Sequence, residues 1–155
     1  MNQQTISSHQ YPWLTMNNLL EINPSHLEMR ETKFTNEEMN LFIRNWINGG
    51  NSNLRSLAFR LNNLNLETIL NGIPSVLRTA PGSMPYNWCP LSSFYSLFSV
   101  LPPELITFCF DQFFEIRNVN GVVASIVVER VANDDFILLT WPDYKGQPYP
   151  VELIV

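Results

Sequence analysis

Two stretches of the sequence repeat one pattern, a short apolar strand followed by a capped helix, and this repeat most constrains the fold. A shift of 30 residues places Leu27 on Leu57. Residues 26–31 and residues 57–61 alternate apolar and polar side chains, which is the pattern of a strand with one buried face. Residues 11–73 are therefore expected to form a strand-helix-strand-helix unit built from two repeats.

The helices of this part begin at residues that can cap their first turns. Thr35 and Glu38 stand at the two positions of a capping box, in which each side chain accepts a hydrogen bond from the other residue's backbone N–H. Asn65 is placed to cap the shorter second helix, and Thr15 to cap a further short helix over residues 13–22. The apolar stripe that marks the first helix consists of Met39, Phe42, Ile43, Trp46 and Ile47.

The second repeat also fits the template of a leucine-rich repeat. Residues 54–64 follow L-x-x-L-x-L-x-x-N-x-L, with Phe59 in place of one leucine and Asn62 at the asparagine position. In such repeats the asparagine side chain pairs with buried backbone groups at the turn that leaves the strand. The first repeat fits less well, since Pro24 and Thr32 replace the first leucine and the asparagine. Two repeats are fewer than the roughly three that a free solenoid needs, so another part of the chain has to cap them.

The C-terminal part has the pattern of an antiparallel meander. Asn120 and Gly121 form a strong signal for a hairpin turn, and residues 132–135 are expected to form the next turn. The strands that these turns connect are expected over residues 113–119, 122–131 and 136–141. Such a meander would supply the cap that two repeats lack.

The segment between these parts, residues 74–110, alternates proline- and serine-containing pieces with aromatic residues. We expect it to be a long irregular connection with a helix near residues 91–100. The whole chain is thus predicted to be one α+β domain, with a leucine-rich-repeat-like half packed against the meander. Its expected parts are a flexible end (1–10) and a single domain (11–155), which comprises the repeat-like part (11–73), the connection (74–110) and the meander (111–142).

Charge and sequence pattern argue against several classes of protein. The chain has 9 Lys and Arg against 14 Asp and Glu, a net charge of −5 that disfavours a nucleic-acid-binding protein. Residues 79–103 carry no charge, but five prolines interrupt them, so we expect no membrane span. The first ten residues lack the pattern of a signal peptide, and the two cysteines provide neither a disulfide framework nor zinc-site spacing. We therefore expect a cytoplasmic or nuclear protein.

The side chains that most often perform chemistry form no obvious catalytic or metal-binding set. His9 lies in the expected flexible end. His26 opens a strand, and its nearest acid, Glu28, is expected to point to solvent, so His26 is interpreted as structural. Cys89 and Cys109 are interpreted as small buried apolar side chains.

Two pairs of carboxylates have structural explanations. Glu37 and Glu38 fit the first turn of a helix, where capping and the helix dipole favour negative charge. Asp134 and Asp135 fall in a turn between strands. Because no catalytic, metal or cofactor site emerges from these residues, we expect a protein that is not an enzyme and needs no cofactor.

The outward positions of the two repeat strands are the candidate binding site. In repeat proteins such positions line a binding face, and here they are Glu28, Arg30, Ala58 and Arg60. Arg30 and Arg60 occupy the same position of the repeat. One interpretation is two solvated strand arginines, and the other is a shared stripe that faces a ligand. Under the second, replacing both arginines with alanine should weaken partner binding and leave the fold intact.

Residues of the N-terminal half follow a known signature. It opens in residues 13–23 and 26–29 and continues in Phe34-Thr35, Met39-Asn40, Phe42-Ile43, Trp46-Ile47, Gly49, Asn51 and Leu54. A later part is matched by residues 114–118, Gly121, Ala124, Ile126 and Trp141. These residues resemble the F-box-associated domain, type 2, of the F-box proteins that are greatly expanded in nematodes. The resemblance covers residues 11–73 and, at fewer positions, 111–142.

The resemblance implies a function in protein recognition. In this family the domain follows an F-box, which binds the Skp adaptor of a cullin-RING ubiquitin ligase, and the domain is thought to recruit the substrate. The expected partners are therefore an unknown protein substrate and, indirectly, the Skp–cullin complex. Residues 1–12 are too short for an F-box. A second hypothesis is therefore a stand-alone scaffold or decoy that binds a partner without coupling it to a ligase.

Overall fold

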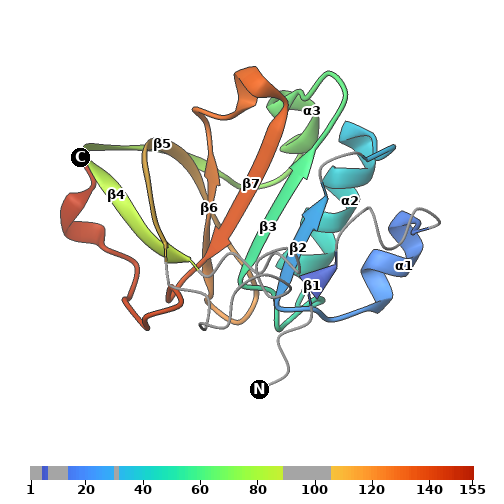
Figure 1. Ribbon diagram of the computed structural model, residues 1–155, viewed down its shortest axis with the longest axis horizontal. Helices are drawn as coiled ribbons and strands as arrows, with labels where there is room; N and C mark the ends of the chain where they lie inside the picture. The colour runs from blue at the N-terminus through green and yellow to red at the C-terminus, as the bar shows by residue number, and fades with distance from the viewer. Residues whose placement is uncertain (1–4, 7–13, 30–31, 89–105) are drawn as a thin grey trace, which may run out of the picture.

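Within the residues that the structure describes, seven strands form one mixed sheet with three α-helices on one of its faces (Figure 1). The structure is a computed structural model and describes residues 5–6, 14–29, 32–88 and 106–155. The strands are β1 (Thr5–Ile6), β2 (His26–Met29), β3 (Ser56–Arg60), β4 (Val76–Trp88), β5 (Ile106–Arg117), β6 (Val123–Val127) and β7 (Asp135–Thr140). The helices are α1 (Met16–Glu21), α2 (Asn36–Ile47) and α3 (Leu66–Ile69), with two 3₁₀ turns, η1 (Val131–Asn133) and η2 (Val151–Leu153). The predicted α+β class is confirmed.

The two predicted repeat strands lie side by side in the sheet. The strand order is β1-β2-β3-β7-β6-β5-β4, in which β1, β2 and β3 are parallel and every later pair is antiparallel. The register pairs Leu27 with Leu57 and Met29 with Phe59. This register confirms the alignment at a shift of 30 residues, because the aligned residues are direct neighbours across β2 and β3.

The leucine-rich-repeat label for this part stays a prediction, and one expectation attached to it is wrong. Asn62, expected among buried backbone groups, is exposed. The turn after β3 is held instead by side chains from elsewhere in the chain. The Thr32 hydroxyl donates to the Arg60 carbonyl at 2.9 Å, and the Asp134 carboxylate accepts from the Leu64 N–H at 3.0 Å.

The predicted helix caps are confirmed. Thr35 Oγ1 accepts from the Glu38 N–H at 3.1 Å, and Glu38 Oε1 accepts from the Thr35 N–H at 3.1 Å. Thr15 caps α1 and Asn65 caps α3 in the same manner, each through its side-chain oxygen. The apolar stripe of α2 is buried except for Ile47, which is half-buried.

The expectation of an irregular connection over residues 74–110 is wrong wherever the structure describes this segment. β4 and β5 pair antiparallel along most of their lengths, with a register shift between Thr79 and Met84. β4 lies at the edge of the sheet. An edge strand leaves part of its backbone unpaired, so Pro81 and Pro85 are tolerated there. The helix predicted near residues 91–100 lies outside the described residues.

The ends of the other elements differ less from the predictions. Thr5–Ile6, within the stretch expected to be a flexible end, pairs with β2 as β1. The meander is confirmed as β5, β6 and β7, but β6 ends at Val127, before the expected residue 131, because the chain turns there into η1. Within the described ranges, no helix has the length and apolar character needed to cross a bilayer.

The two faces of the sheet are covered by different parts of the chain. Strand side chains alternate between the faces, so Leu57 and Phe59 pack with the helices while Ser56, Ala58 and Arg60 face the other way. The helices lie on the first face near β2 and β3 (Figure 1). On the second face the C-terminal segment, residues 142–155, packs near β4 through an aromatic cluster that includes Tyr149. Among the described residues, the C-terminal segment reaches the outward face of β3 where Tyr144 contacts Ser56, and the rest of the outward face around Ala58 and Arg60 has neither cover.

The sheet curls until its two ends approach one another. β2 and β4 are five strand-to-strand steps apart in the strand order. A flat sheet would separate them by about 24 Å, at about 4.8 Å a step. The ring centroids of His26 on β2 and Trp88 on β4 are nevertheless only 5.5 Å apart. The register shift in β4 accounts for part of this bend, because such irregularities increase local twist.

Tyr86 joins β4, at one edge of the sheet, to the backbone beside β3 and at the end of β7, and it predicts how stability depends on pH. Its hydroxyl lies 3.0 Å from the Arg55 carbonyl and 2.9 Å from the Thr140 carbonyl, and the side chain is fully buried. Burial raises the pKa of Tyr86 well above its ordinary value. Below about pH 10 both the folded and the unfolded chain keep the phenol neutral. Above it the unfolded chain ionises first, so the free energy of unfolding should fall by up to about 1.4 kcal/mol per pH unit.

Urea unfolding between about pH 9 and pH 11 measures this effect. The Tyr86→Phe variant should be less stable at neutral pH by about 1–2 kcal/mol, because the hydrogen bond is lost. Its stability should then fall less steeply with pH than that of the wild type. Parallel curves for the two proteins would show that Tyr86 is not the group responsible.

Candidate functional site

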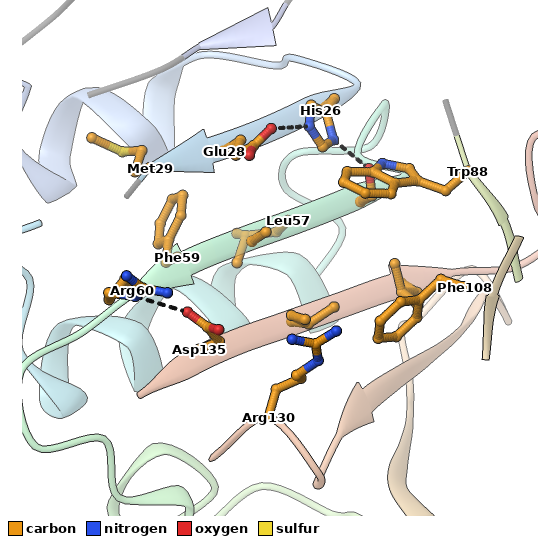
Figure 2. A pocket seen from close by; sticks show the side chains of 14 residues that line it. His26, Glu28, Met29, Leu57, Phe59, Arg60, Trp88, Phe108, Arg130 and Asp135 are labelled. Atoms are coloured by element: carbon orange, nitrogen blue, oxygen red, sulfur yellow. Dashed lines mark hydrogen bonds and ion pairs between the residues drawn. The ribbon is translucent and has the colours of Figure 1, made fainter. Parts of the chain in front are cut away.

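A pocket of about 360 Å³ lies on the outward face of β2, β3 and β7, where neither the helices nor the C-terminal segment covers the sheet (Figure 2). Its floor is apolar and consists of Ala58 on β3 with Ile137 and Leu139 on β7. Trp88 on β4 and Phe108 on β5 form an aromatic wall, which the curl of the sheet brings over the floor. Charged side chains surround this apolar centre: Glu28, Arg60, Arg130 and Asp135.

The predicted site residues fall on this pocket as far as the structure describes them. Glu28, Ala58 and Arg60 all line it. Arg30 lies outside the described residues, so its place in the shared stripe stays a prediction. Side chains alternate between the two faces of a strand, and this alternation, from which the positions were predicted, brings three of them to a single pocket.

A chain of polar contacts forms part of the pocket lining and runs from β2 to the C-terminal segment. His26 is fully buried, and its Nδ1 bonds the Ser56 hydroxyl. The Ser56 oxygen lies 2.8 Å from the Tyr144 hydroxyl, and His26 Nε2 lies 3.5 Å from Glu28 Oε2. The expectation that Glu28 points to solvent is therefore wrong: the side chain is 24% exposed and faces His26. His26 and Glu28 share a face because they are two residues apart on one strand.

This set of serine, histidine and glutamate has the composition of a nucleophilic triad, but its geometry is that of a structural network. Ser56 is only 1% exposed, and its hydroxyl is engaged by both His26 and Tyr144. The neighbouring backbone is paired on both sides, with β2 and with β7. It therefore offers no free N–H pair that could stabilise an oxyanion. The network ties β2, β3 and the C-terminal segment together beside the floor.

The charged groups around the pocket differ in whether they already have partners. Arg60 Nε donates to Asp135 Oδ1 at 3.1 Å, and this hydrogen bond raises the pKa of Arg60. Glu28 faces His26. The guanidinium of Arg130 lies 5.6 Å from the centre of the Phe108 ring, a cation–π contact on the aromatic wall. Figure 2 shows Arg130 reaching from beside β7 toward Phe108.

The predicted site included no residue of β7 and none of Trp88, Phe108 and Arg130. Trp88 and Phe108 belong to the segment expected to be irregular. A signal was nevertheless present, because Tyr86 and Trp88, like Phe108 and Phe110, are two residues apart, the spacing of neighbours on one face of a strand. Arg130 lies in the turn after β6, and its sequence context carries no such signal.

The expectations for the remaining reactive side chains have mixed outcomes. Cys109 is exposed, not buried as expected, because its position on β5 points it away from both cores. Cys89 and His9 lie outside the described residues. Glu38 caps α2, and Asp134 holds the turn after β3, but Asp135, expected in a turn, is the first residue of β7 and lines the pocket. No group of three or more metal-ligating side chains occurs in the described part of the chain.

The asparagines of the recognised signature connect the helices. The side-chain amide of Asn51 donates to the Leu19 carbonyl at 3.0 Å and the Ile22 carbonyl at 2.6 Å, at the C-terminal end of α1. Asn40 donates in the same way to the Ile69 carbonyl at 2.8 Å, at the end of α3. Helices this short are marginal alone, and these bonds satisfy carbonyls that a helix end leaves unpaired. The signature therefore describes how the helices are held and identifies no contact residue.

Asn51→Asp should destabilise the fold by about 3 kcal/mol. The change keeps the shape of the side chain but places a carboxylate against two carbonyls in a site where Asn51 is 5% exposed. The exposed Asn62 offers a matched control, since Asn62→Asp introduces the same charge without burial. Urea unfolding of the two variants measures the difference. Equal losses of stability would contradict the capping role of Asn51.

Comparisons with known proteins bear on the same part of the chain. Residues 1–59 match the profile of a family described as F-box associated. A Caenorhabditis elegans protein named Skn-1 dependent zygotic transcript 15 protein is 26% identical over 115 residues, which cover 74% of this chain and 28% of that protein. The chain thus spans less than a third of the length of this relative.

No solved structure matches the chain. The family match includes α1, β2, α2 and nearly all of β3, the elements that carry the asparagine contacts and one side of the pocket. Residues 1–59 are thus similar to the F-box associated family, which supports the resemblance drawn from the sequence.

Proposed function

We propose that this chain is a protein-binding module, the substrate-recruiting part of a cullin-RING ubiquitin-ligase adaptor, and that it binds its partner through the pocket on β2, β3 and β7. The observation that carries the proposal is the pocket itself. It combines an apolar floor, the aromatic wall of Trp88 and Phe108 and four charged side chains on the second face of the sheet, in a part that the described residues leave open. Such a combination is typical of recognition sites, in which apolar contacts give affinity and a few polar groups give orientation.

The mechanism of such a module is positioning. The pocket would hold a segment of the substrate on a rigid sheet, and the transfer of ubiquitin would be performed by other subunits. This account requires no cofactor, metal or nucleophile from the chain. It agrees with the His26–Ser56 network, whose groups are buried and engaged with one another.

The family match supports the link to a ligase, since F-box associated domains are named for their association with the F-box. The Skp–cullin complex would be an indirect partner, reached through an F-box. The alternative is the stand-alone scaffold or decoy, which binds the same partners without a ligase. The two hypotheses differ in the proteins that accompany a bound substrate.

An affinity purification of the tagged 155-residue chain from a Caenorhabditis elegans lysate, analysed by mass spectrometry, tests the proposal. Recovery of Skp and cullin together with a further specific protein would support the ligase function. Recovery of a specific partner without Skp or cullin would overturn the ligase link and favour the scaffold or decoy. The purification should be run beside an untagged lysate, so that abundant ligase subunits are not counted by mistake.

A further inference from the structure

We infer that the pocket on β2, β3 and β7 binds an acidic peptide segment, with a carboxylate of the peptide on Arg130 and a neighbouring apolar side chain on the floor. The inference rests on the proposed function, because it names the class of partner for the same pocket. The argument depends on the partners of the charged side chains and on the position of Arg130.

The two carboxylates of the pocket are already engaged. Asp135 accepts from Arg60 at 3.1 Å, so each of these charges offsets the other. Glu28 lies 3.5 Å from His26. A ligand cation would have to compete with these partners for either carboxylate. The pocket therefore presents little uncompensated negative charge to a ligand.

Arg130 is in the opposite situation. It is exposed, and in the described ranges its guanidinium makes a contact with the Phe108 ring but no ion pair. Five N–H donors in a planar fork suit a carboxylate, which can accept two of them at once. Arg130 is thus the charged side chain of this pocket with which a ligand carboxylate can form an ion pair.

The aromatic wall points to the same charge preference. A ring face attracts cations, and a basic ligand would be expected to use Trp88 or Phe108 in this way. The guanidinium of Arg130 lies 5.6 Å from the centre of the Phe108 ring, so a ligand cation would meet a like charge there. An anion would instead find a guanidinium held in place by the ring beneath it.

The apolar floor determines which kind of peptide side chain can bind next to the carboxylate. Ala58, Ile137 and Leu139 present apolar surface between the aromatic wall and the charged side chains. A volume of about 360 Å³ is at the lower end of the range of ligand pockets, which fits a short peptide segment with one apolar side chain inserted. An acidic residue next to a leucine or similar side chain satisfies both parts of the site.

A nuclear magnetic resonance titration of the full chain with three blocked tetrapeptides tests the inference. The probes are glycine-leucine-glutamate-glycine and the same peptide with glutamine or lysine in place of glutamate. The indole N–H signal of Trp88, identified by its loss in Trp88→Phe, reports on the pocket. We expect the glutamate peptide to bind at least about fivefold more tightly than the glutamine peptide, and the lysine peptide to bind most weakly.

Arg130→Gln separates this preference from apolar binding. It should reduce the affinity for the glutamate peptide to that for the glutamine peptide, and leave the latter unchanged. Lys145→Gln removes the same charge from an exposed residue outside the pocket lining and should retain the preference. The inference is overturned if the lysine peptide binds as well as the glutamate peptide, if Arg130→Gln has no effect, or if no peptide shifts the Trp88 signal.

These outcomes are independent of the ligase question, since the titration uses the chain alone and synthetic peptides. A charge preference found together with the absence of Skp and cullin from the purification would retain the acidic-peptide site and reject the ligase link. Recovery of Skp and cullin together with the absence of a charge preference would retain the ligase link and reject the acidic partner.

Discussion

Ala58→Trp is expected to abolish partner binding while the chain stays folded. Ala58 is half-buried on the floor of the pocket, and its side chain points away from the core that β3 shares with the helices. An indole at this position would occupy the space between the floor and the aromatic wall, where a partner's side chain would insert. Loss of a central apolar contact in a recognition site commonly costs at least about 2 kcal/mol, or about thirtyfold in affinity.

Leu41→Trp is the matched control for this variant. Leu41 is 54% exposed on α2 and does not line the pocket, so the same new side chain is placed away from it. Quantitative mass spectrometry of proteins purified with each variant measures the effect. Specific partners should be depleted with Ala58→Trp and retained with Leu41→Trp, and both variants should melt within about 5 °C of the wild type. Retention of all partners by Ala58→Trp would contradict the assignment of the pocket.

Asp143→Ala is expected to cost about 4 kcal/mol of folding free energy, a large part of the stability of a domain of this size. Asp143 is fully buried after β7, and its carboxylate accepts four hydrogen bonds. Two come from the backbone and side-chain amides of Asn87, at 2.9 and 2.7 Å. The other two come from the backbone N–H groups of Lys145 and Gln147, both at 2.9 Å. Truncation would leave these donors without an acceptor.

The same carboxylate connects stability to the pocket, because Asn87 precedes Trp88 of the aromatic wall. Asp143→Asn should cost less than Asp143→Ala, since one amide oxygen can still accept the turn N–H groups. Asp111→Ala offers a control, because that carboxylate accepts from the Ser83 hydroxyl at the surface and should lose less than about 1 kcal/mol. Urea unfolding measures all three. A loss below about 1 kcal/mol for Asp143→Ala would show that the donors find other partners.

The parts of the fold that the sequence predicted are those with local causes. The capping box of Thr35 and Glu38 depends on residues three apart, and the structure shows both of its hydrogen bonds. The alignment of Leu27 with Leu57 depends on one short repeat, and the register confirms it. Periodicity and capping act within a few residues, so a single sequence carries them in full.

The parts that could not be predicted depend on distant pairing. Pro81 and Pro85 argue against a strand until it is known that β4 is an edge, and only the whole sheet order shows this. The aromatic wall follows from the curl that brings Trp88 to His26, which no local pattern specifies. The candidate site was therefore half predictable: its floor follows from strand alternation, but its wall and Arg130 come from elsewhere in the chain.

One error could have been avoided with the sequence alone. His26 and Glu28 were assigned to different surroundings, although residues two apart on a strand share a face. The structure places them 3.5 Å apart beside the pocket. Alternation also bears on the exposed Cys109, because its neighbours two residues away on β5, Thr107 and Asp111, are both polar.

A site-specific photocrosslink tests most directly the central claim, that a protein partner binds the outward face of β2, β3 and β7. The photoreactive amino acid p-benzoylphenylalanine would replace Arg60, whose side chain is 60% exposed beside the pocket, or Leu41 on α2 as the control. After irradiation in lysate, we expect a crosslinked protein from position 60 but not from position 41, and its loss when Ala58→Trp is added. An equal yield from position 41, or a partner that co-purifies without any crosslink from position 60, would contradict the account.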